Sequence, residues 1–229
     1  MNNIMTFKRR EIKYLLDDDE YNSLKERLQA RLVEDEHGRS TICNIYYDTP
    51  DFRIIRKSLE KPVYKEKLRL RSYGTAGAED KVFVELKKKY NGIVYKRRET
   101  LTLAQSDEYL AGHTKAPYDT QIFREIDWFR DYYGNLKPAM YISYEREAYY
   151  SLENPDLRIT FDRNIMYRSY NLSLAAGVEG ESILEAGQHL MELKAGGAIP
   201  VWLTKALDEL GIYPASFSKY GRAYLSQVG

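Results

Sequence analysis

The sequence has little of several features that mark particular classes of protein. Its one cysteine, Cys43, excludes an intramolecular disulfide framework and a zinc site built from several cysteines. Seven prolines and 14 glycines are too few for a low-complexity chain. No run approaches the roughly 18 apolar residues of a membrane span, and Met1 to Arg10 lacks the apolar core of a signal peptide. We therefore expect an intracellular, cytoplasmic protein.

The chain also has almost no net charge, because 35 Lys and Arg offset 34 Asp and Glu. This balance excludes a uniformly basic nucleic-acid coat and an acidic disordered tail. Tyrosine is abundant, with 21 copies, and 43% of the residues are hydrophobic. Aromatic rings favour pleated, half-buried surfaces, and a chain of this length can bury a substantial core.

Alternating apolar and polar residues between turn signals predict eight strands, at 7–16, 42–47, 65–73, 81–89, 93–103, 141–150, 157–165 and 189–194. Helical spacing predicts helices after Asp17 and around 106–111, 120–133, 202–210 and 217–225. No internal repeat or flexible linker interrupts this order. The sequence thus predicts a single α+β domain, residues 1–229, built on an antiparallel sheet.

The dipeptide Asn91-Gly92 lies between two of these strands and is a strong hairpin signal. A two-residue turn would place Lys87 opposite Lys96. A bulge would shift the register by one residue. The sequence therefore leaves open whether Lys96, Arg97 or Arg98 shares a face with Lys87.

Positive charge is concentrated in the predicted strands. Residues 61–99 contain 12 Lys and Arg against 5 Asp and Glu, a net charge of +7. Because side chains alternate across a strand, Lys67, Arg69 and Arg71 share one face. One such face is ordinarily the solvated side of a half-buried sheet, but like charges opposite one another across several strands are destabilising. We expect a sheet closed into a barrel, with a linear polyanion as its ligand.

Several short motifs occur in a characteristic order: Lys13-Tyr14, Ile45-Tyr46-Tyr47-Asp48, Leu68-Arg69-Leu70-Arg71, Phe83-Val84-Glu85-Leu86-Lys87, Tyr144-Glu145-Arg146, Leu157-Arg158-Ile159, Leu190-Met191-Glu192-Leu193-Lys194 and Phe217-Ser218-Lys219-Tyr220. In this order the chain resembles the VTC domain, the polyphosphate polymerase domain of vacuolar transporter chaperone complexes. That domain is part of the triphosphate tunnel metalloenzyme, or CYTH-like, superfamily. The likeness runs from Lys8 almost to the C-terminus.

The resemblance implies an antiparallel eight-stranded β tunnel with helices packed outside and a C-terminal helix near the tunnel mouth. It implies a polyphosphate polymerase that transfers the γ-phosphate of ATP to a growing chain with Mn²⁺ or Mg²⁺. The implied phosphate-binding residues are Lys13, Arg69, Arg71, Lys87, Arg146, Arg158 and Lys219. Of these, Lys219, Arg69 and Arg71 are the implied catalytic residues, and Glu192 is the implied metal ligand.

The sequence departs from the family's motifs at two places, so alternative functions stay open. The superfamily's first-strand Glu-x-Glu-x-Lys motif retains only Glu11 and Lys13, and Ser216 stands where polymerases of the family have a lysine. A tripolyphosphatase or nucleoside triphosphatase on the same tunnel is one alternative, and a non-catalytic polyphosphate-binding module is another. Glu85, Glu11 or Asp162 could assist the metal. A nucleic-acid partner is not expected, because few aromatic residues accompany the cations. Polyphosphate export would require a separate membrane protein.

Overall fold

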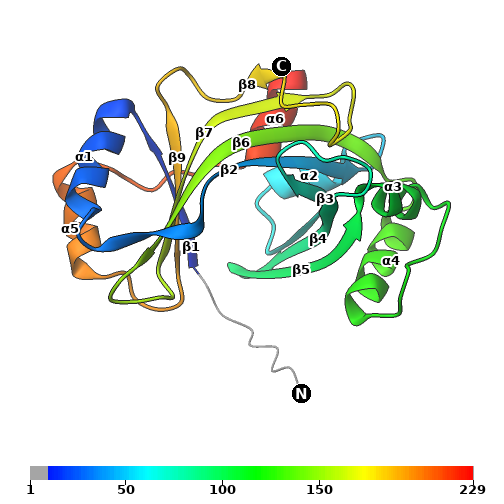
Figure 1. The fold of residues 1–229 in the computed structure, drawn as a ribbon, viewed down its shortest axis with the longest axis horizontal. Helices are drawn as coiled ribbons and strands as arrows, with labels where there is room; N and C mark the ends of the chain where they lie inside the picture. The colour runs from blue at the N-terminus through cyan, green and yellow to red at the C-terminus, as the bar shows by residue number, and fades with distance from the viewer. Residues whose placement is uncertain (1–9, 229) are drawn as a thin grey trace. The chain divides into compact units, whose positions relative to one another are not determined.

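The computed structural model describes residues 10–228 and confirms the predicted α+β fold built on an antiparallel sheet (Figure 1). Residues 7–9 of the first expected strand lie outside the described residues. The strands are β1 (Arg10–Leu16), β2 (Leu32–Asp48), β3 (Tyr64–Tyr73), β4 (Lys81–Tyr90), β5 (Ile93–Thr102), β6 (Lys137–Ser151), β7 (Arg158–Arg168), β8 (Glu181–Ser182) and β9 (His189–Ala195). Eight of them correspond to the predicted strands. The additional one, β8, is two residues long and pairs with β7.

The helices within the same residues are α1 (Asp18–Leu28), α2 (Arg53–Leu59), α3 (Leu103–Ala111), α4 (Gln121–Tyr133), α5 (Val201–Glu209) and α6 (Lys219–Val228). Helix α1 begins where the acidic residues predict, with Asp17 and Glu20 forming a reciprocal capping box. Helix α2 is not marked by the sequence pattern. None of the helices in residues 10–228 is long and apolar enough to cross a membrane.

The strands are hydrogen-bonded in the order β1-β9-β7-β6-β2-β3-β4-β5. Within residues 10–228 this order has two ends, β1 and β5, so the sheet stays open instead of closing into the expected barrel. Strand β5 carries Lys96, Arg97, Arg98 and Glu99 in succession. A charged edge strand of this kind discourages pairing with a further strand.

The chain divides into two compact units. The first comprises the described part of Met1–Ser40 together with Tyr144–Ile165 and Leu184–Ser218. The second comprises Thr41–Ser143, Met166–Ile183 and the described part of Lys219–Gly229. Strands β2, β6 and β7 contribute residues to both units. A single domain spanning residues 1–229 stays a prediction.

In the first unit, α1 and α5 lie side by side against one face of β1, β9 and β7 (Figure 1). The core between them is apolar and includes Tyr14, Leu24, Phe161, Met191 and Leu203. Alternation along the strands puts Glu11 and Lys13 on the opposite face of β1. This opposite face is therefore available for polar chemistry.

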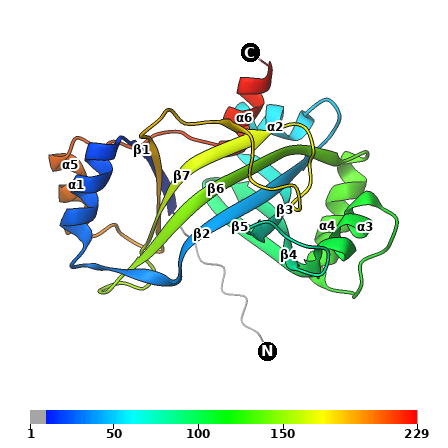
Figure 2. The ribbon, with the colours of Figure 1, turned by 45° about the horizontal axis from the view of Figure 1, so that its top comes forward.

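In the second unit, α3 and α4 cover one face of the β3–β4–β5 sheet (Figure 1). Leu68, Val84 and Leu86 of the strands pack there with Phe123 and Phe129 of α4. Helices α2 and α6 contact each other beside β3, as Figures 1 and 2 both show. The face of the sheet opposite α3 and α4 carries the charged side chains.

Candidate functional site

The charged face of β3, β4 and β5 in the second unit is here called the basic face. Its rows follow the strand register, in which Lys87 lies opposite both Lys67 and Lys96, and Lys89 lies opposite Lys65. The cations at these alternating positions are Lys65, Lys67, Arg69, Arg71, Lys81, Lys87, Lys89, Lys96 and Arg98. Among the described residues of these rows, Glu85 is the single acid. Opposed like charges destabilise a sheet, so this face is suited to a ligand with several negative charges.

The register of the β4–β5 hairpin confirms a two-residue turn at Asn91-Gly92, because Lys87 pairs with Lys96 and Tyr90 pairs with Ile93. Arg97 lies opposite Leu86, on the side of the apolar core. Its Nε lies 3.7 Å from a carboxylate oxygen of Glu125 in α4. The structure therefore assigns Lys96 and Arg98 to the basic face and Arg97 to the other.

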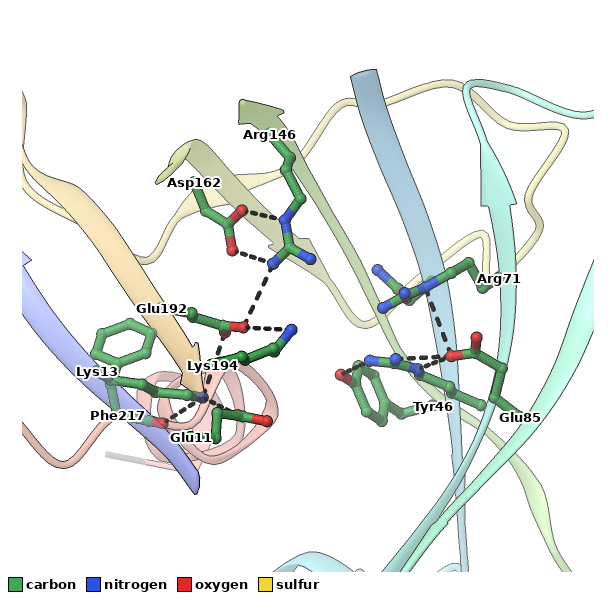
Figure 3. A network of polar contacts seen from close by, with 12 residues as sticks. Glu11, Lys13, Tyr46, Arg71, Glu85, Arg146, Asp162, Glu192, Lys194 and Phe217 are labelled. Carbon is green, nitrogen blue, oxygen red and sulfur yellow. Dashed lines mark hydrogen bonds and ion pairs between the residues drawn. The ribbon is translucent and has the colours of Figure 1, made fainter. Parts of the chain in front are cut away.

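The carboxylate of Glu85 is buried among three of the cations. It accepts a hydrogen bond from Arg69 Nε at 2.8 Å, and Lys96 Nζ lies 2.5 Å from its other oxygen. Arg71 Nε lies 3.7 Å away (Figure 3). Burial by itself would raise the pKa of Glu85, but Arg69, Arg71 and Lys96 hold that pKa well below its ordinary value. Glu85 is therefore ionised and offsets part of the positive charge.

Two uncharged side chains of β2 orient the arginines. Tyr46 accepts a hydrogen bond through its hydroxyl from Arg69 Nη1 at 3.2 Å. Asn44, fully buried, accepts one from Arg71 Nε at 2.9 Å and donates to the carbonyl of Ile142 at 3.0 Å. Sequence reasoning missed both roles, although Asn44 stands out as a polar residue within the apolar strand 42–47.

Lys219, the first residue of α6, belongs to the same unit as the basic face and is buried. The ring of the next residue, Tyr220, stacks on that of Tyr46 with 4.7 Å between centroids. Lys67 Nζ lies 5.8 Å from the centroid of the Tyr220 ring. The first turn of α6 thus lies beside Tyr46 and, through the Tyr220 ring, near Lys67 of the basic face.

In the first unit, the face opposite the core carries charges of both signs. Arg146 forms two parallel hydrogen bonds with Asp162, at 2.6 and 2.7 Å, and its Nη2 lies 3.6 Å from Glu192 (Figure 3). Burial would lower the pKa of Arg146, but Asp162 and Glu192 raise it well above the ordinary value. Arg146 is therefore a permanent cation with a dedicated buried partner.

Lys13 joins the same set of contacts. Its Nζ donates to the carbonyl of Phe217 at 3.0 Å and lies 3.4 Å from Glu192 and 3.6 Å from Glu11 (Figure 3). Lys194 Nζ approaches the other oxygen of Glu192 at 3.6 Å. Glu192 therefore lies among three cations, Lys13, Arg146 and Lys194.

Arg158 lies on this face too, opposite Lys194 in the register of β7 and β9. It pairs with Asp35 of β2, and its side chain is 46% exposed. The residues assigned by resemblance are thus found in two sets. The second unit brings together Arg69, Arg71, Lys87 and Lys219, whereas the first contains Lys13, Arg146, Arg158 and Glu192.

A model of the VTC domain matches residues 8–228. The chain belongs to the VTC domain family. Two solved structures share its fold: a protein from Bacillus halodurans described as a candidate adenylate cyclase, and one from Hippeastrum described as a candidate adenylyl cyclase with a dominant triphosphatase activity. The first is 17% identical with a TM-score of 0.55, over 92% of this chain and 95% of that one. The second is 16% identical with a TM-score of 0.55, over 95% of this chain and 96% of that one. No curated protein is significantly similar to the chain.

The carboxylates of this VTC domain do not form a ready-made metal cage, because residues 10–228 contain no group of three or more His, Cys, Asp or Glu side chains arranged to hold a metal ion. Mg²⁺ and similar hard cations are commonly held by one or two carboxylates together with substrate phosphates. Glu192, with Glu11 on the other side of Lys13, fits that mode. Asp162 fits it less well, because Arg146 engages both of its oxygens.

Proposed function

We propose that this VTC domain is a metal-dependent polyphosphate polymerase that transfers the γ-phosphate of ATP to a growing inorganic polyphosphate chain. The observation that carries the proposal is the basic face, where nine cations of three neighbouring strands accompany one carboxylate. Membership of the VTC family supports the same reading. The partners of the reaction are ATP and inorganic polyphosphate.

The length of the basic face supports a chain as the ligand. Lys65 and Arg71 are six residues apart on β3, which corresponds to about 20 Å in an extended strand. The three phosphates of a nucleotide would cover only part of this distance. A longer polyphosphate could neutralise the lysine rows as well as the arginines.

The residues present match what phosphoryl transfer demands of a protein. The reaction needs in-line positioning and neutralisation of charge on the transferred group, with little covalent chemistry from side chains. Arg69 and Arg71 offer guanidinium groups, which grip phosphate oxygens through paired donors, and the lysines act as point charges. A divalent metal ion would supply further neutralisation of the phosphates. The terminal phosphate of the chain is the nucleophile, so no nucleophilic side chain is required.

A hydrolase of triphosphate or short polyphosphate is the second candidate, and the activity described for the Hippeastrum protein favours it. It would use the same cations to hold the substrate, with water in place of the chain end. A binding module without turnover is the third. These functions differ in their products, so one assay separates them.

The test is to incubate the purified protein with ATP and Mn²⁺ and to follow both chain growth on gels and orthophosphate release. Chain growth is the expected result. Orthophosphate release without growth would replace the polymerase with a hydrolase, and binding without turnover would leave only the binding module.

A matched pair of variants tests the site itself. Arg69→Ala/Arg71→Ala should abolish chain growth, whereas Arg97→Ala, on the opposite face of β5, should retain it. Circular dichroism spectra would confirm that both variants are folded. Normal synthesis by the double variant would overturn the assignment of the basic face.

A further inference from the structure

Tyr220 and Asp48 are joined by a buried hydrogen bond that connects α6 to the end of β2. The Tyr220 hydroxyl donates to Asp48 Oδ2 at 2.9 Å, and both residues are 1% exposed. They are 172 positions apart in the sequence. A buried hydrogen bond is costly to break because its donor and acceptor would be left without partners, so this contact is suited to fixing the position of the helix.

Asp48 is itself held rigidly. Its Oδ1 accepts from the backbone N–H of Thr49 at 2.8 Å and of Ile54 at 2.9 Å, and its Oδ2 accepts from that of Ile55 at 3.0 Å. These donors include the first turn of α2, where backbone N–H groups lack partners within the helix. The carboxylate is therefore a fixed point to which the Tyr220 hydroxyl is attached.

The ring of Tyr220 makes a separate contact on the other side. It stacks on Tyr46, whose hydroxyl accepts from Arg69. Hydroxyl and ring thus have different roles: the hydroxyl binds Asp48, and the ring contacts the aromatic residue that orients an arginine of the basic face. Removing the hydroxyl alone would leave the stack intact.

Lys219 immediately precedes Tyr220 and is 8% exposed. Because Lys219 is the first residue of α6, the position of its backbone depends on the position of the first helical turn. The second turn of α6 has its own contact, between Tyr224 and Phe52 with centroids 5.2 Å apart. The bond to Asp48 therefore restrains the part of the helix that carries Lys219.

We infer that Tyr220 is a positioning residue for phosphoryl transfer, which fixes the first turn of α6 through its hydroxyl bond to Asp48 and so orients Lys219 toward the bound phosphates. The inference rests on the proposed function and on the catalytic role that the family resemblance implies for Lys219. Misplacing a group in an active site by about 1 Å can lower the rate on the order of a hundredfold. Tyr220 touches no phosphate in this scheme and acts only through Lys219.

The experiment compares Tyr220→Phe with Tyr224→Phe, which makes the same substitution one turn later on the same helix. Polyphosphate synthesis gives kcat and KM for ATP, and isothermal titration gives the affinity for polyphosphate. Tyr220→Phe should lower kcat about tenfold or more while KM and polyphosphate affinity stay within about twofold, because the cations of the basic face are unchanged. Tyr224→Phe should match the parent protein in all three.

Hydrogen exchange of the backbone amides provides a readout that does not depend on activity. Amides of the second turn of α6, which bond to the carbonyls of the first turn, should exchange faster in Tyr220→Phe than in Tyr224→Phe. If the parent protein elongates polyphosphate and Tyr220→Phe has the same kcat, the inference is overturned and the proposed function stands. Equal losses of kcat and polyphosphate affinity would also overturn it, because they indicate a general structural role.

If the parent protein shows no turnover, the proposed function fails, and hydrogen exchange alone decides whether Tyr220 fixes the helix. Faster exchange confined to Tyr220→Phe would uphold that restraint. Equal exchange in the two variants would overturn it.

Discussion

Arg69 directs two nitrogens at one oxygen of Glu85, with Nε at 2.8 Å and Nη2 at 2.7 Å. Glu85 is completely buried, and it lies within a face that otherwise carries cations in the same rows. This single carboxylate therefore limits the repulsion within the basic face before a polyanion binds.

Glu85→Gln should destabilise the unliganded protein and increase its response to polyphosphate. The amide keeps the size of the side chain but removes the charge that balances Arg69, Arg71 and Lys96. Breaking a buried ion pair from one side typically costs roughly 3 kcal/mol of unfolding free energy. Urea denaturation should show a loss of this order, and polyphosphate should raise the Tm of the variant more than that of the parent protein.

The exposed Glu79, replaced in the same way, is the control and should change neither quantity. Equal stability of Glu85→Gln and the parent protein would contradict the role given to this carboxylate.

The contribution of Glu85 to folding stability should also depend on pH. Because the folded-state pKa of Glu85 is lowered, its contribution is present above about pH 4.3 and is lost as the pH falls through the lower folded value.

Lys96 should make polyphosphate binding depend on pH near neutrality. Burial lowers the pKa of Lys96 to about 8, although Glu85 acts in the opposite direction. The amine is therefore mostly charged at pH 7 and mostly neutral at pH 9, while the arginines stay charged throughout. Since phosphate groups have lost their last proton by about pH 7, the charge of the ligand is constant, and affinity should fall as the pH rises across this range.

Isothermal titration at pH 7, 8 and 9 would measure this fall in affinity. Titration at pH 8 in two buffers of different ionisation enthalpy should also show proton uptake on binding. Lys96→Arg should remove both effects, because a guanidinium does not titrate there. A pH dependence that persists in this variant would exclude Lys96 as its source.

Lys89→Gln should weaken binding of long polyphosphate but leave tripolyphosphate binding unchanged. Lys89 lies in the row with Lys65, at the end of the basic face away from Arg71. Only a chain longer than three phosphates should reach both ends. The loss of one phosphate contact should also make the dependence of log affinity on log salt concentration shallower by about one.

Lys88→Gln is the matched control, since Lys88 is adjacent in β4 but points to the other face, where its Nζ lies 3.1 Å from Glu125. Binding assays at several salt concentrations with both ligands would compare the two variants. If Lys88→Gln and Lys89→Gln weaken the binding of long polyphosphate equally, the row of Lys65 and Lys89 does not distinguish long from short chains.

The basic face could be predicted from the sequence because its determinants are local. Alternation along β3 and β4 places the cations on one face, and the turn at Asn91-Gly92 fixes the register to β5. Helix α2 could not be predicted in this way. Its N-cap, Phe52, has a left-handed backbone and no capping side-chain bond. The carboxylate that accepts from its first turn belongs to Asp48, the last residue of β2.

The pairing of Arg146 with Asp162 could not be predicted from the sequence either. The two residues lie on the consecutive strands β6 and β7, and the connection at 152–157 is too long to fix the register between them. The family resemblance implies that Arg146 binds phosphate, and it leaves open whether Asp162 assists a metal. The structure joins them through two hydrogen bonds. Where the connecting segment does not set the register, the pairing of two strands depends on tertiary packing, which local patterns do not encode.

Asp162→Asn should therefore act on stability, whereas Glu192→Gln should act on metal use. Removing the anion leaves the buried guanidinium of Arg146 without its closest partner, which typically costs roughly 3–5 kcal/mol of unfolding free energy. Urea denaturation would measure this loss. Among molecules that remain folded, the Mn²⁺ concentration for half-maximal activity should stay at the parent value in Asp162→Asn and rise in Glu192→Gln, whose carboxylate fits the metal-binding mode. If Asp162→Asn instead raises the Mn²⁺ requirement without loss of stability, Asp162 is a metal ligand and its pairing with Arg146 is secondary.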